Sequence, residues 1–360
     1  MEGYMTRQVN VGGVTIGGGA PIRIQSMNNT RTADVKATLD QIYKLKDCGC
    51  DITRVAVPDM EAAAAIREIT SNSPIPVVAD IHFDYRLAIE AARNGAAKIR
   101  INPGNIGGPD RVRQVVDVCR EMNIPIRVGV NSGSCERELV DKYGGVCAAA
   151  LCESARGAVR LLEDHGFEDI VISIKSSSPR LTIDTYRTLS SECDYPLHVG
   201  VTEAGTMREG VVRSAVGIGT LLAEGIGDTI RVSLTDDPCE EVYAAISILK
   251  ALNLKTGGIE FVSCPTCGRT RVPLIELANK VEDRISRLPY NIKVAVMGCA
   301  VNGPGEAREA DIGLAGGVGE FLLFRKGQTC GKIVATDIDR AVDEFVKEVI
   351  RVGEEANKAD

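Results

Sequence analysis

Short runs of β-branched and other apolar residues recur along the first two thirds of the chain, and longer stretches separate them. There are eight runs, at residues 22–25, 52–57, 77–82, 98–102, 126–131, 170–175, 197–203 and 229–233. The stretch after the first run has an approximate helical stripe, formed by Leu39, Ile42, Tyr43 and Leu45. Glycines such as Gly49 and Gly95 stand where such helices would end. Eight strand–helix units in about 230 residues predict a (β/α)8 barrel, the TIM-barrel fold.

The alternative for this alternation is a doubly wound open sheet. That fold does not require eight units, and no G-x-G-x-x-G motif follows the first run to mark a dinucleotide site. A hairpin is expected before the barrel, because residues 9–11 and 14–16 flank the pair Gly12-Gly13. The pattern therefore favours the barrel.

The rhythm changes after a linker-like stretch at residues 253–258. Strands are expected at 259–263, 292–297, 311–315 and 320–325, and helices at 272–288 and 337–351. The first of these helices has an apolar face formed by Ile275, Ala278, Val281, Ile285 and Leu288. We therefore expect a substrate-binding barrel over residues 1–253 and a smaller α+β domain over residues 258–360.

Polar residues gather at the carboxyl ends of the expected barrel strands, where such barrels form their active sites. These residues are Arg54, Asp80, His82, Arg100, Asn102, Arg127, Asn131, Lys175, His198, Thr202, Glu203, Arg231 and Ser233. Five of them are cations within strands of mostly valine and isoleucine. An unpaired buried cation costs several kcal/mol, and Asp80 and Glu203 are too few to pair with all five. The pattern indicates a bound polyanion, and a diphosphate fits it best. For the two histidines, a structural hydrogen-bonding role is an equal alternative.

Composition narrows the classes of partner. A net charge of −7, 4% aromatic residues and no tryptophan argue against a nucleic-acid binder. No signal-peptide pattern is visible, and no apolar run reaches the roughly 18 residues of a membrane span. Twelve cysteines without a secretory signal indicate reduced thiols and a cytoplasmic location rather than a disulfide framework.

Three of the cysteines follow strand ends in the smaller domain. Cys264 and Cys267 form a C-x-x-C pair after its first strand, and Cys299 ends its second. Thiolates that meet at one sheet edge can bind zinc or an iron–sulfur cluster, and the spacing does not choose between them. Cys330 or Glu306 could fill a fourth position. A thioredoxin-like redox pair is disfavoured by the Gly-Arg-Thr-Arg sequence that follows. The remaining cysteines are interpreted as structural.

Two long motifs carry a resemblance to a known family. Cys264-Pro-Thr-Cys-Gly-Arg269 and Met297-Gly-Cys-Ala-Val-Asn-Gly-Pro-Gly-Glu-Ala307 resemble the 4-hydroxy-3-methylbut-2-enyl diphosphate synthases, in their bacterial two-domain form. These are iron–sulfur enzymes of the non-mevalonate isoprenoid pathway. The likeness extends through the barrel, in Gln25-Ser-Met27, Asp80-Ile-His82-Phe, Arg100-Ile-Asn-Pro-Gly-Asn105, Arg127-Val-Gly-Val-Asn131-Ser-Gly-Ser, Val201-Thr-Glu203-Ala-Gly and Arg231-Val-Ser233.

The resemblance implies a reaction and a set of site residues. The substrate would be 2-C-methyl-D-erythritol 2,4-cyclodiphosphate, converted by two-electron reductive dehydroxylation and ring opening. A 4Fe-4S cluster would be held by Cys264, Cys267, Cys299 and Glu306, with Cys330 outside it. The substrate would be bound by Arg54, Asp80, His82, Arg100, Arg127, Asn131, Lys175, Arg231 and Ser233. Glu203 would lie at the reacting carbons, and it and Glu306 are the expected catalytic residues. The electron donor would be ferredoxin or flavodoxin.

Chain geometry predicts a head-to-tail homodimer. The helix after the eighth strand returns the chain to the face opposite the barrel mouth. About five residues then lead to the second domain, and they span less than about 20 Å. The cysteines of one chain would thus lie far from its own mouth, and a reversed partner would bring the two halves together. The resemblance implies the same arrangement; the alternative is a hinge that closes one chain on itself.

Three other functions are alternatives to this one. The first is a phosphate-binding barrel transferase, of the pterin type, with a structural zinc. The second is a zinc-stabilised scaffold protein, which gives no reason for five cations at one barrel face. The third is a radical S-adenosylmethionine enzyme, which is disfavoured because no C-x-x-x-C-x-x-C motif is present.

Overall fold

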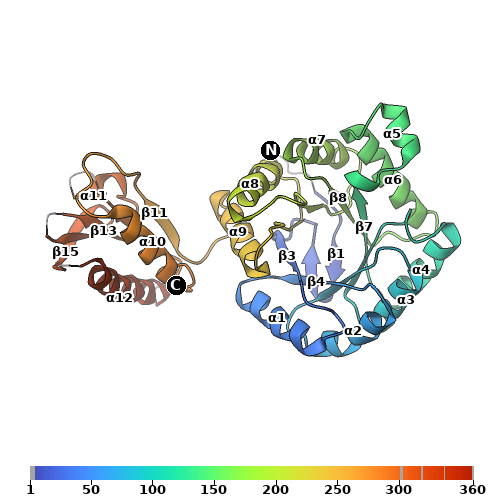
Figure 1. Ribbon diagram of the computed structural model, residues 1–360, viewed down its shortest axis with the longest axis horizontal. Coiled ribbons are helices and arrows are strands. Elements are labelled where there is room, and N and C mark those ends of the chain that lie inside the picture. Colours follow the sequence, from blue (N-terminus) through green and yellow to red (C-terminus); the bar gives the residue numbers. More distant parts are fainter. Residues whose placement is uncertain (1–4, 301–302, 318, 336, 359–360) are drawn as a thin grey trace. The chain divides into compact units, whose positions relative to one another are not determined.

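The computed structural model describes residues 5–300, 303–317, 319–335 and 337–358. Val301 and Asn302, within the second long motif, lie outside the described residues. The chain divides into two units, Met1–Lys255 and Thr256–Asp360, each with its own apolar core. The two units are drawn in Figure 1 and are described one at a time below.

The first unit is a barrel of eight parallel strands, as predicted (Figure 1). The strands are β3 (Arg23–Met27), β4 (Ile52–Ala56), β5 (Val77–Asp80), β6 (Lys98–Ile101), β7 (Ile126–Asn131), β8 (Ile170–Lys175), β9 (His198–Val199) and β10 (Thr229–Ile230). Parallel pairing is continuous from β8 through β3 to β10 and β9. Bridges from Ile172 to Leu197 and from Ser176 to Val201 close the ring. Each of the eight expected runs overlaps one strand, so the barrel is confirmed.

Helices follow the strands and surround the barrel. They are α1 (Val35–Asp47), α2 (Met60–Asn72), α3 (Tyr85–Arg93), α4 (Pro109–Glu121), α6 (Ala148–Glu163), α7 (Pro179–Ser190), α8 (Met207–Ala223) and α9 (Pro238–Ala251). A short helix, α5 (Arg137–Tyr143), is inserted after β7. Ile42 and Leu45 of α1 are buried as expected, but Tyr43 is half exposed. Its hydroxyl instead donates a hydrogen bond to the carbonyl of Asn72, 3.0 Å away.

A hairpin closes the amino-terminal end of the barrel. Its strands β1 (Val9–Val11) and β2 (Val14–Ile16) pair antiparallel, as predicted. Val9, Val11 and Ile16 pack against three residues from the amino-terminal parts of barrel strands, namely Ile52, Val78 and Val171. This apolar layer separates the polar interior of the barrel from the solvent at its amino-terminal end.

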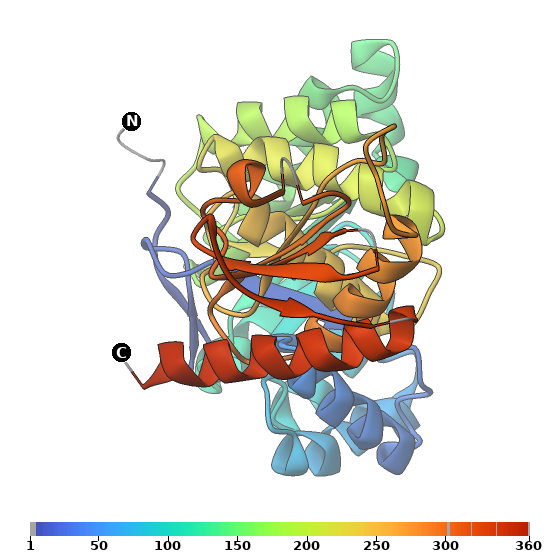
Figure 2. The same ribbon diagram turned by 90° about the vertical axis from the view of Figure 1, so that its left-hand side faces the viewer.

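The second unit has one mixed sheet. Its strands are β11 (Glu260–Ser263), β12 (Lys293–Met297), β13 (Ile312–Gly316), β14 (Phe321–Arg325) and β15 (Gln328–Ile333), in that order, the first three parallel and the last two antiparallel. Helices α10 (Leu274–Ile285) and α12 (Ile338–Asn357) pack together against the sheet (Figure 2). Val281 and Phe345 are fully buried between these layers. The one-turn helix α11 (Gly303–Glu306) lies between β12 and β13 in the chain.

Two features of this unit differ from expectation. Strand β15 was not predicted, because residues 328–333 are mostly polar and the turn before them lacks the usual signal. Lys326 and Gly327 both adopt left-handed backbone (φ 47° and 78°), as in a type I′ hairpin turn, but lysine seldom marks one. Ile275 was expected on the buried face of α10 and is 67% exposed, since Leu274 and Leu277 take that face instead.

In the part of the chain that the structure describes, every helix is too short or too polar to cross a lipid bilayer.

Candidate active site

Three arginines inside the barrel are almost completely buried. Arg54 on β4, Arg100 on β6 and Arg127 on β7 are each at most 1% exposed. Successive residues of a strand face opposite sides of the sheet. The neighbours Val55 and Val128 belong to the apolar core outside the strands, so the arginines face the interior. The sequence thus places three permanent cations where only polar partners or a ligand can compensate their charge.

Asp80 on β5 is shared between two of these arginines. Its Oδ2 lies 3.4 Å from Nε of Arg54, and its Oδ1 lies 3.1 Å from Nη1 of Arg100. Burial raises the pKa of Asp80, but the two arginines lower it by more, so it lies well below its usual value. One ionised carboxylate therefore serves two guanidinium groups.

In the part of the chain that the structure describes, Arg127 donates to a single, neutral side chain. Its Nη1 donates to Oε1 of Gln25 at 3.0 Å. Its Nε and Nη2, like Nη1 of Arg54 and Nε of Arg100, are buried without a hydrogen-bond acceptor among the described residues. Burial, and then the charges of Arg54 and Arg100, lower the pKa of Arg127. The charged form of Arg127 is therefore costly in the free protein, and an anion would relieve that cost.

Arg231 is paired with a residue that the sequence analysis missed. Its Nη2 and Nε lie 3.1 and 3.2 Å from the carboxylate oxygens of Glu241 on α9. Glu241 is 4% exposed and also accepts from Ser26 Oγ at 3.0 Å and the amide of Leu234 at 3.1 Å. It lies on a helix behind the barrel wall and not at a strand end. An acid in the first turn of the helix that follows Arg231 was the available signal.

Two lysines extend the cationic interior. Lys98 lies two residues before Arg100 on β6, is fully buried, and its Nζ has no acceptor in the described part of the chain. Strand alternation places Lys98 and Arg100 on one face, and this signal could have found it. Burial, followed by Arg127 and Arg54, lowers the pKa of Lys98 far below its usual value. Burial, followed by repulsion from Arg54 and Arg100, lowers the pKa of Lys175, at the end of β8, to about 6.

Hydrogen bonds hold His198 in place. It is 5% exposed, and its Nδ1 lies 2.7 Å from Oγ1 of Thr229. Its backbone carbonyl accepts a hydrogen bond from the Tyr186 hydroxyl at 2.6 Å. Burial, and then nearby cations led by Arg127, lower its pKa far below the usual value, so the ring is neutral.

The remaining predicted residues lie around the opening. Asn131 Oδ1 is 3.4 Å from Nη2 of Arg100. Ser233 lines a cavity of about 20 Å³ together with Arg54, Lys175, His198 and Arg231, room for about one water molecule. His82 and Glu203 follow the ends of β5 and β9 and are exposed. Glu203 has left-handed backbone (φ 51°), which is uncommon for a residue other than glycine.

In the second unit, the four predicted ligands line one pocket of about 320 Å³. Its lining includes Cys264, Cys267, Arg269, Thr270, Cys299 and Glu306. Hydrogen bonds fix the loops that carry them: the amide of Gly298 donates to Sγ of Cys264 at 3.2 Å, and the amide of Cys267 donates to Oγ1 of Thr270 at 3.2 Å. Hydrogen bonds from the Arg269 backbone and side chain lower the pKa of Cys267, which favours a thiolate. Cys330 is exposed on β15 and does not line this pocket.

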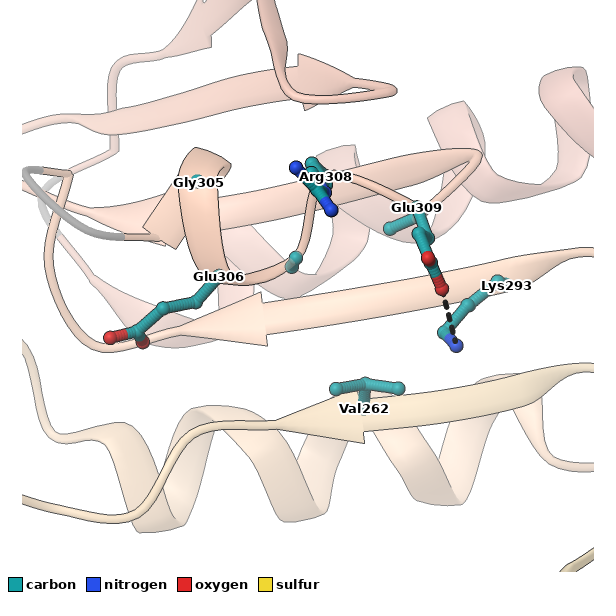
Figure 3. Close-up of a pocket in the computed structure, with 8 residues that line it drawn as sticks. Val262, Lys293, Gly305, Glu306, Arg308 and Glu309 are labelled. Carbon is teal, nitrogen blue, oxygen red and sulfur yellow. Dashed lines mark ion pairs between the residues drawn. The ribbon is translucent and has the colours of Figure 1, made fainter.

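Glu306 ends α11 and joins this pocket to a second one of about 440 Å³. Figure 3 shows its carboxylate directed away from the ion pair that Glu309 forms with Lys293 at 3.9 Å. Among the described residues, no three His, Cys, Asp or Glu side chains are arranged to hold one metal ion. The donors surround a volume instead, which suits a group larger than a single ion.

These features define a protein with a (β/α)8 barrel of strongly cationic interior and a second, cysteine-bearing unit. Matches to known proteins make the assignment specific. The GcpE TIM-barrel domain matches residues 6–246, and the GcpE C-terminal domain matches residues 260–351. The chain is 59% identical over 344 residues to the 4-hydroxy-3-methylbut-2-en-1-yl diphosphate synthase (flavodoxin) of Ruminiclostridium cellulolyticum, covering 96% of this chain and 97% of the relative. It is 57% identical over 349 residues to the same enzyme of Clostridium acetobutylicum, covering 97% and 99%. The chain belongs to this family.

Family membership confirms the function expected from the motifs. The chain is an iron–sulfur oxidoreductase of the non-mevalonate isoprenoid pathway, and it forms 4-hydroxy-3-methylbut-2-enyl diphosphate from the cyclodiphosphate. The alternative of a transferase with a structural zinc is thereby set aside. A crystal structure of Yersinia pestis dihydropteroate synthase in complex with a sulfonamide drug is similar, with a TM-score of 0.50 and 11% identity over 69% of this chain and 100% of that chain. At that identity the likeness shows the barrel fold alone.

Proposed function

We propose that the barrel interior binds the diphosphate of the substrate. The cations that would contact it are Arg54, Arg100, Arg127, Lys175 and Arg231, with hydrogen bonds from Asn131 and Ser233. The supporting observation is the set of buried guanidinium nitrogens that have no acceptor among the described residues, where only Asp80 and Glu241 are buried carboxylates. Asp80 would orient two of the arginines, and His82 and Glu203 would meet the substrate from the rim.

Ring opening itself explains why the site needs so much positive charge. Cleavage of a carbon–oxygen bond to the cyclic diphosphate leaves an additional negative charge on the phosphate oxygens. Preorganised cations that face this developing charge lower the barrier. Because the guanidinium groups of Arg54, Arg100 and Arg127 are already buried at fixed positions, little reorganisation is required when the charge appears.

We propose further that Cys264, Cys267, Cys299 and Glu306 hold the family's 4Fe-4S cluster, within a domain spanning residues 258–360, while residues 1–253 form the substrate domain. The donor set fits the group: three thiols and a carboxylate line one pocket at the edge of the sheet. The cluster, when bound, supplies the two electrons of the reduction one at a time. Arg269 would keep Cys267 ionised for this purpose. Glu203, on its strained backbone, would deliver a proton to the leaving hydroxyl.

The cluster assignment is tested by anaerobic purification followed by iron and acid-labile sulfide analysis. Replacement of Cys264, Cys267 or Cys299 by serine should abolish the cluster, while Cys330→Ser should retain full iron and sulfide content. Cluster loss in Cys330→Ser combined with retention in Cys299→Ser would overturn the ligand set.

Flavodoxin is the proposed electron donor, since the relatives are named as flavodoxin-dependent enzymes. The enzyme would work in the cytoplasm, in keeping with twelve cysteines that are all free thiols.

A head-to-tail homodimer is the proposed assembly. Helix α9 ends at Ala251 and β11 begins at Glu260, so the connection is short. The substrate and the cysteine-bound electron source would therefore come from different chains. Co-expression tests this: an Arg127→Ala chain and a Cys299→Ser chain, each inactive alone, should regain partial activity together. Heterodimers that form and stay inactive would show that each chain uses its own cysteines.

A further inference from the structure

Three arginines that form no ion pair among the described residues lie near the cysteine-bearing edge of the second unit. Most lysines and arginines of this unit form ion pairs, namely Lys280, Arg284, Lys293, Arg325, Lys326, Lys332, Arg340 and Arg351. Arg269, Arg271 and Arg308 form none with any carboxylate in the described ranges, and all three are exposed. Lys347 and Lys358, on α12 and at its carboxyl end, also form no ion pair among the described residues. The three arginines differ from these lysines because they lie close in sequence to the cysteine pair or to Glu306.

The local structure places these arginines on fixed backbone. Arg269 lines the pocket shared by the three cysteines and Glu306. The amide of Arg271 donates to the carbonyl of Gly298 at 2.9 Å, which ties its loop to the end of β12. Arg308 lines the adjoining pocket, which also contains Glu306 (Figure 3). We refer to Arg269, Arg271 and Arg308 as the arginine edge.

We propose that the arginine edge binds the acidic face of the protein that delivers electrons. This inference rests on the proposed cluster site, to which a donor must come close. Cys267 is exposed at the same edge, so electrons can enter there over a short distance. The chain as a whole carries a net charge of −7 and would repel an acidic partner. A local group of unpaired cations overcomes this repulsion and orients the partner at encounter.

Two other roles for these arginines are outcomes of the test. They could offset the negative charge of the cysteine thiolates, in which case their removal lowers the iron and sulfide content. They could contact the substrate's phosphates, in which case their removal weakens substrate binding. A docking role predicts neither change.

The test uses the cluster-loaded enzyme with Arg271→Gln and Arg308→Gln combined, which leaves Arg269 and its hydrogen bonds to Cys267 in place. The matched control combines Lys347→Gln and Lys358→Gln, on α12 and at its carboxyl end, which removes the same charge from the helix-covered face. The probe is a purified, oxidised bacterial flavodoxin, titrated by calorimetry at low and at moderate ionic strength. At low ionic strength the edge variant should bind it about tenfold more weakly than the control, and the difference should shrink as salt is added.

Turnover with chemically reduced methyl viologen separates docking from the other roles. The edge variant should match the control in viologen-driven turnover, in the KM for the cyclodiphosphate and in iron and sulfide content. Unchanged flavodoxin affinity, a raised substrate KM or a lower cluster content would each overturn the proposal. Failure of the cluster assignment would look different, because the unmodified enzyme would then lack sulfide and viologen-driven turnover.

Discussion

Replacing Arg127 and Gln25 together by methionine should move stability and substrate binding in opposite directions. Arg127 is fully buried beside two other arginines, and within the described ranges its only hydrogen-bond acceptor is the Oε1 of Gln25. Nε2 of Gln25 also lacks an acceptor among the described residues. Removing both partners leaves no orphaned group, and replacing buried charge by apolar side chains of similar size stabilises proteins by about 1–4 kcal/mol. The melting temperature of the barrel should rise by about 2 °C or more for each kcal/mol of stabilisation.

Binding should weaken in the same variant, because charge-assisted hydrogen bonds to a buried anion are lost. The expected cost is about 2–4 kcal/mol, which corresponds to a dissociation constant raised about 30-fold to 700-fold. Titration calorimetry with the cyclodiphosphate and scanning calorimetry of the free enzyme, both anaerobic, measure the two effects.

The matched control replaces the exposed, hydrogen-bonded pair Arg187 and Glu224 by methionine. This control should change the free energy of unfolding by no more than about 0.5 kcal/mol and leave the affinity for the substrate unaltered. A melting temperature that falls in the interior variant would refute the reasoning, since it would mean that the charge of Arg127 is already compensated in the free protein.

Two further outcomes follow from the same interior, and a third concerns Cys330 on β15 of the second unit. Asp80→Asn should lower the free energy of unfolding by about 3–5 kcal/mol, because Arg54 and Arg100 lose their shared carboxylate. Since the pKa of Asp80 is depressed in the folded protein, the stabilisation that Asp80 gives is present above its ordinary pKa and is lost as the pH falls. Denaturant titrations across pH 3 to 7 can check this loss. Lys175, with a pKa of about 6 in the free protein, is mostly neutral at pH 7.5. Because a bound diphosphate raises that pKa, substrate binding should take up close to one proton, and the affinity for the substrate should fall as the pH rises. Calorimetry in buffers of different ionisation enthalpy measures this uptake, and a Lys175→Met enzyme that still takes up the proton would contradict it. Cys330→Ser should leave turnover unchanged, as measured with reduced flavodoxin, and a large loss would mean that β15 contributes to the site.

The sequence alone predicts the barrel, because parallel strands buried on both faces are short runs rich in β-branched residues, and eight such runs are visible along the chain. The sequence also predicts that Arg54, Arg100 and Arg127 lie together in the barrel, since cations within apolar strands are expected to face its polar interior. Alternation along β6 already implies that Lys98 faces the interior with Arg100, although Lys98 lies at the start of the strand and not at its end. Family motifs, rather than spacing, chose Glu306 over Cys330.

Other parts of the site depended on tertiary packing. Glu241 reaches Arg231 from a helix, and no periodicity within either segment reports that contact. The hydrogen bond from Arg127 to Gln25 joins residues 102 positions apart in the chain. Strand β15 forms because β14 offers a pairing edge and the backbone at Lys326 accepts a left-handed turn, although its own residues are mostly polar.

The apolar hairpin beneath the barrel has a consequence for the order of events in a catalytic cycle. Because β1 and β2 cover the amino-terminal end with Val9, Val11 and Ile16, ligands and water have the strand carboxyl ends as their route to the charged interior of the described barrel. Incoming substrate and outgoing product must then use the same passage in turn. A tightly held product would therefore inhibit competitively, and its departure, together with rehydration of the arginines, is a step that can limit the rate of turnover.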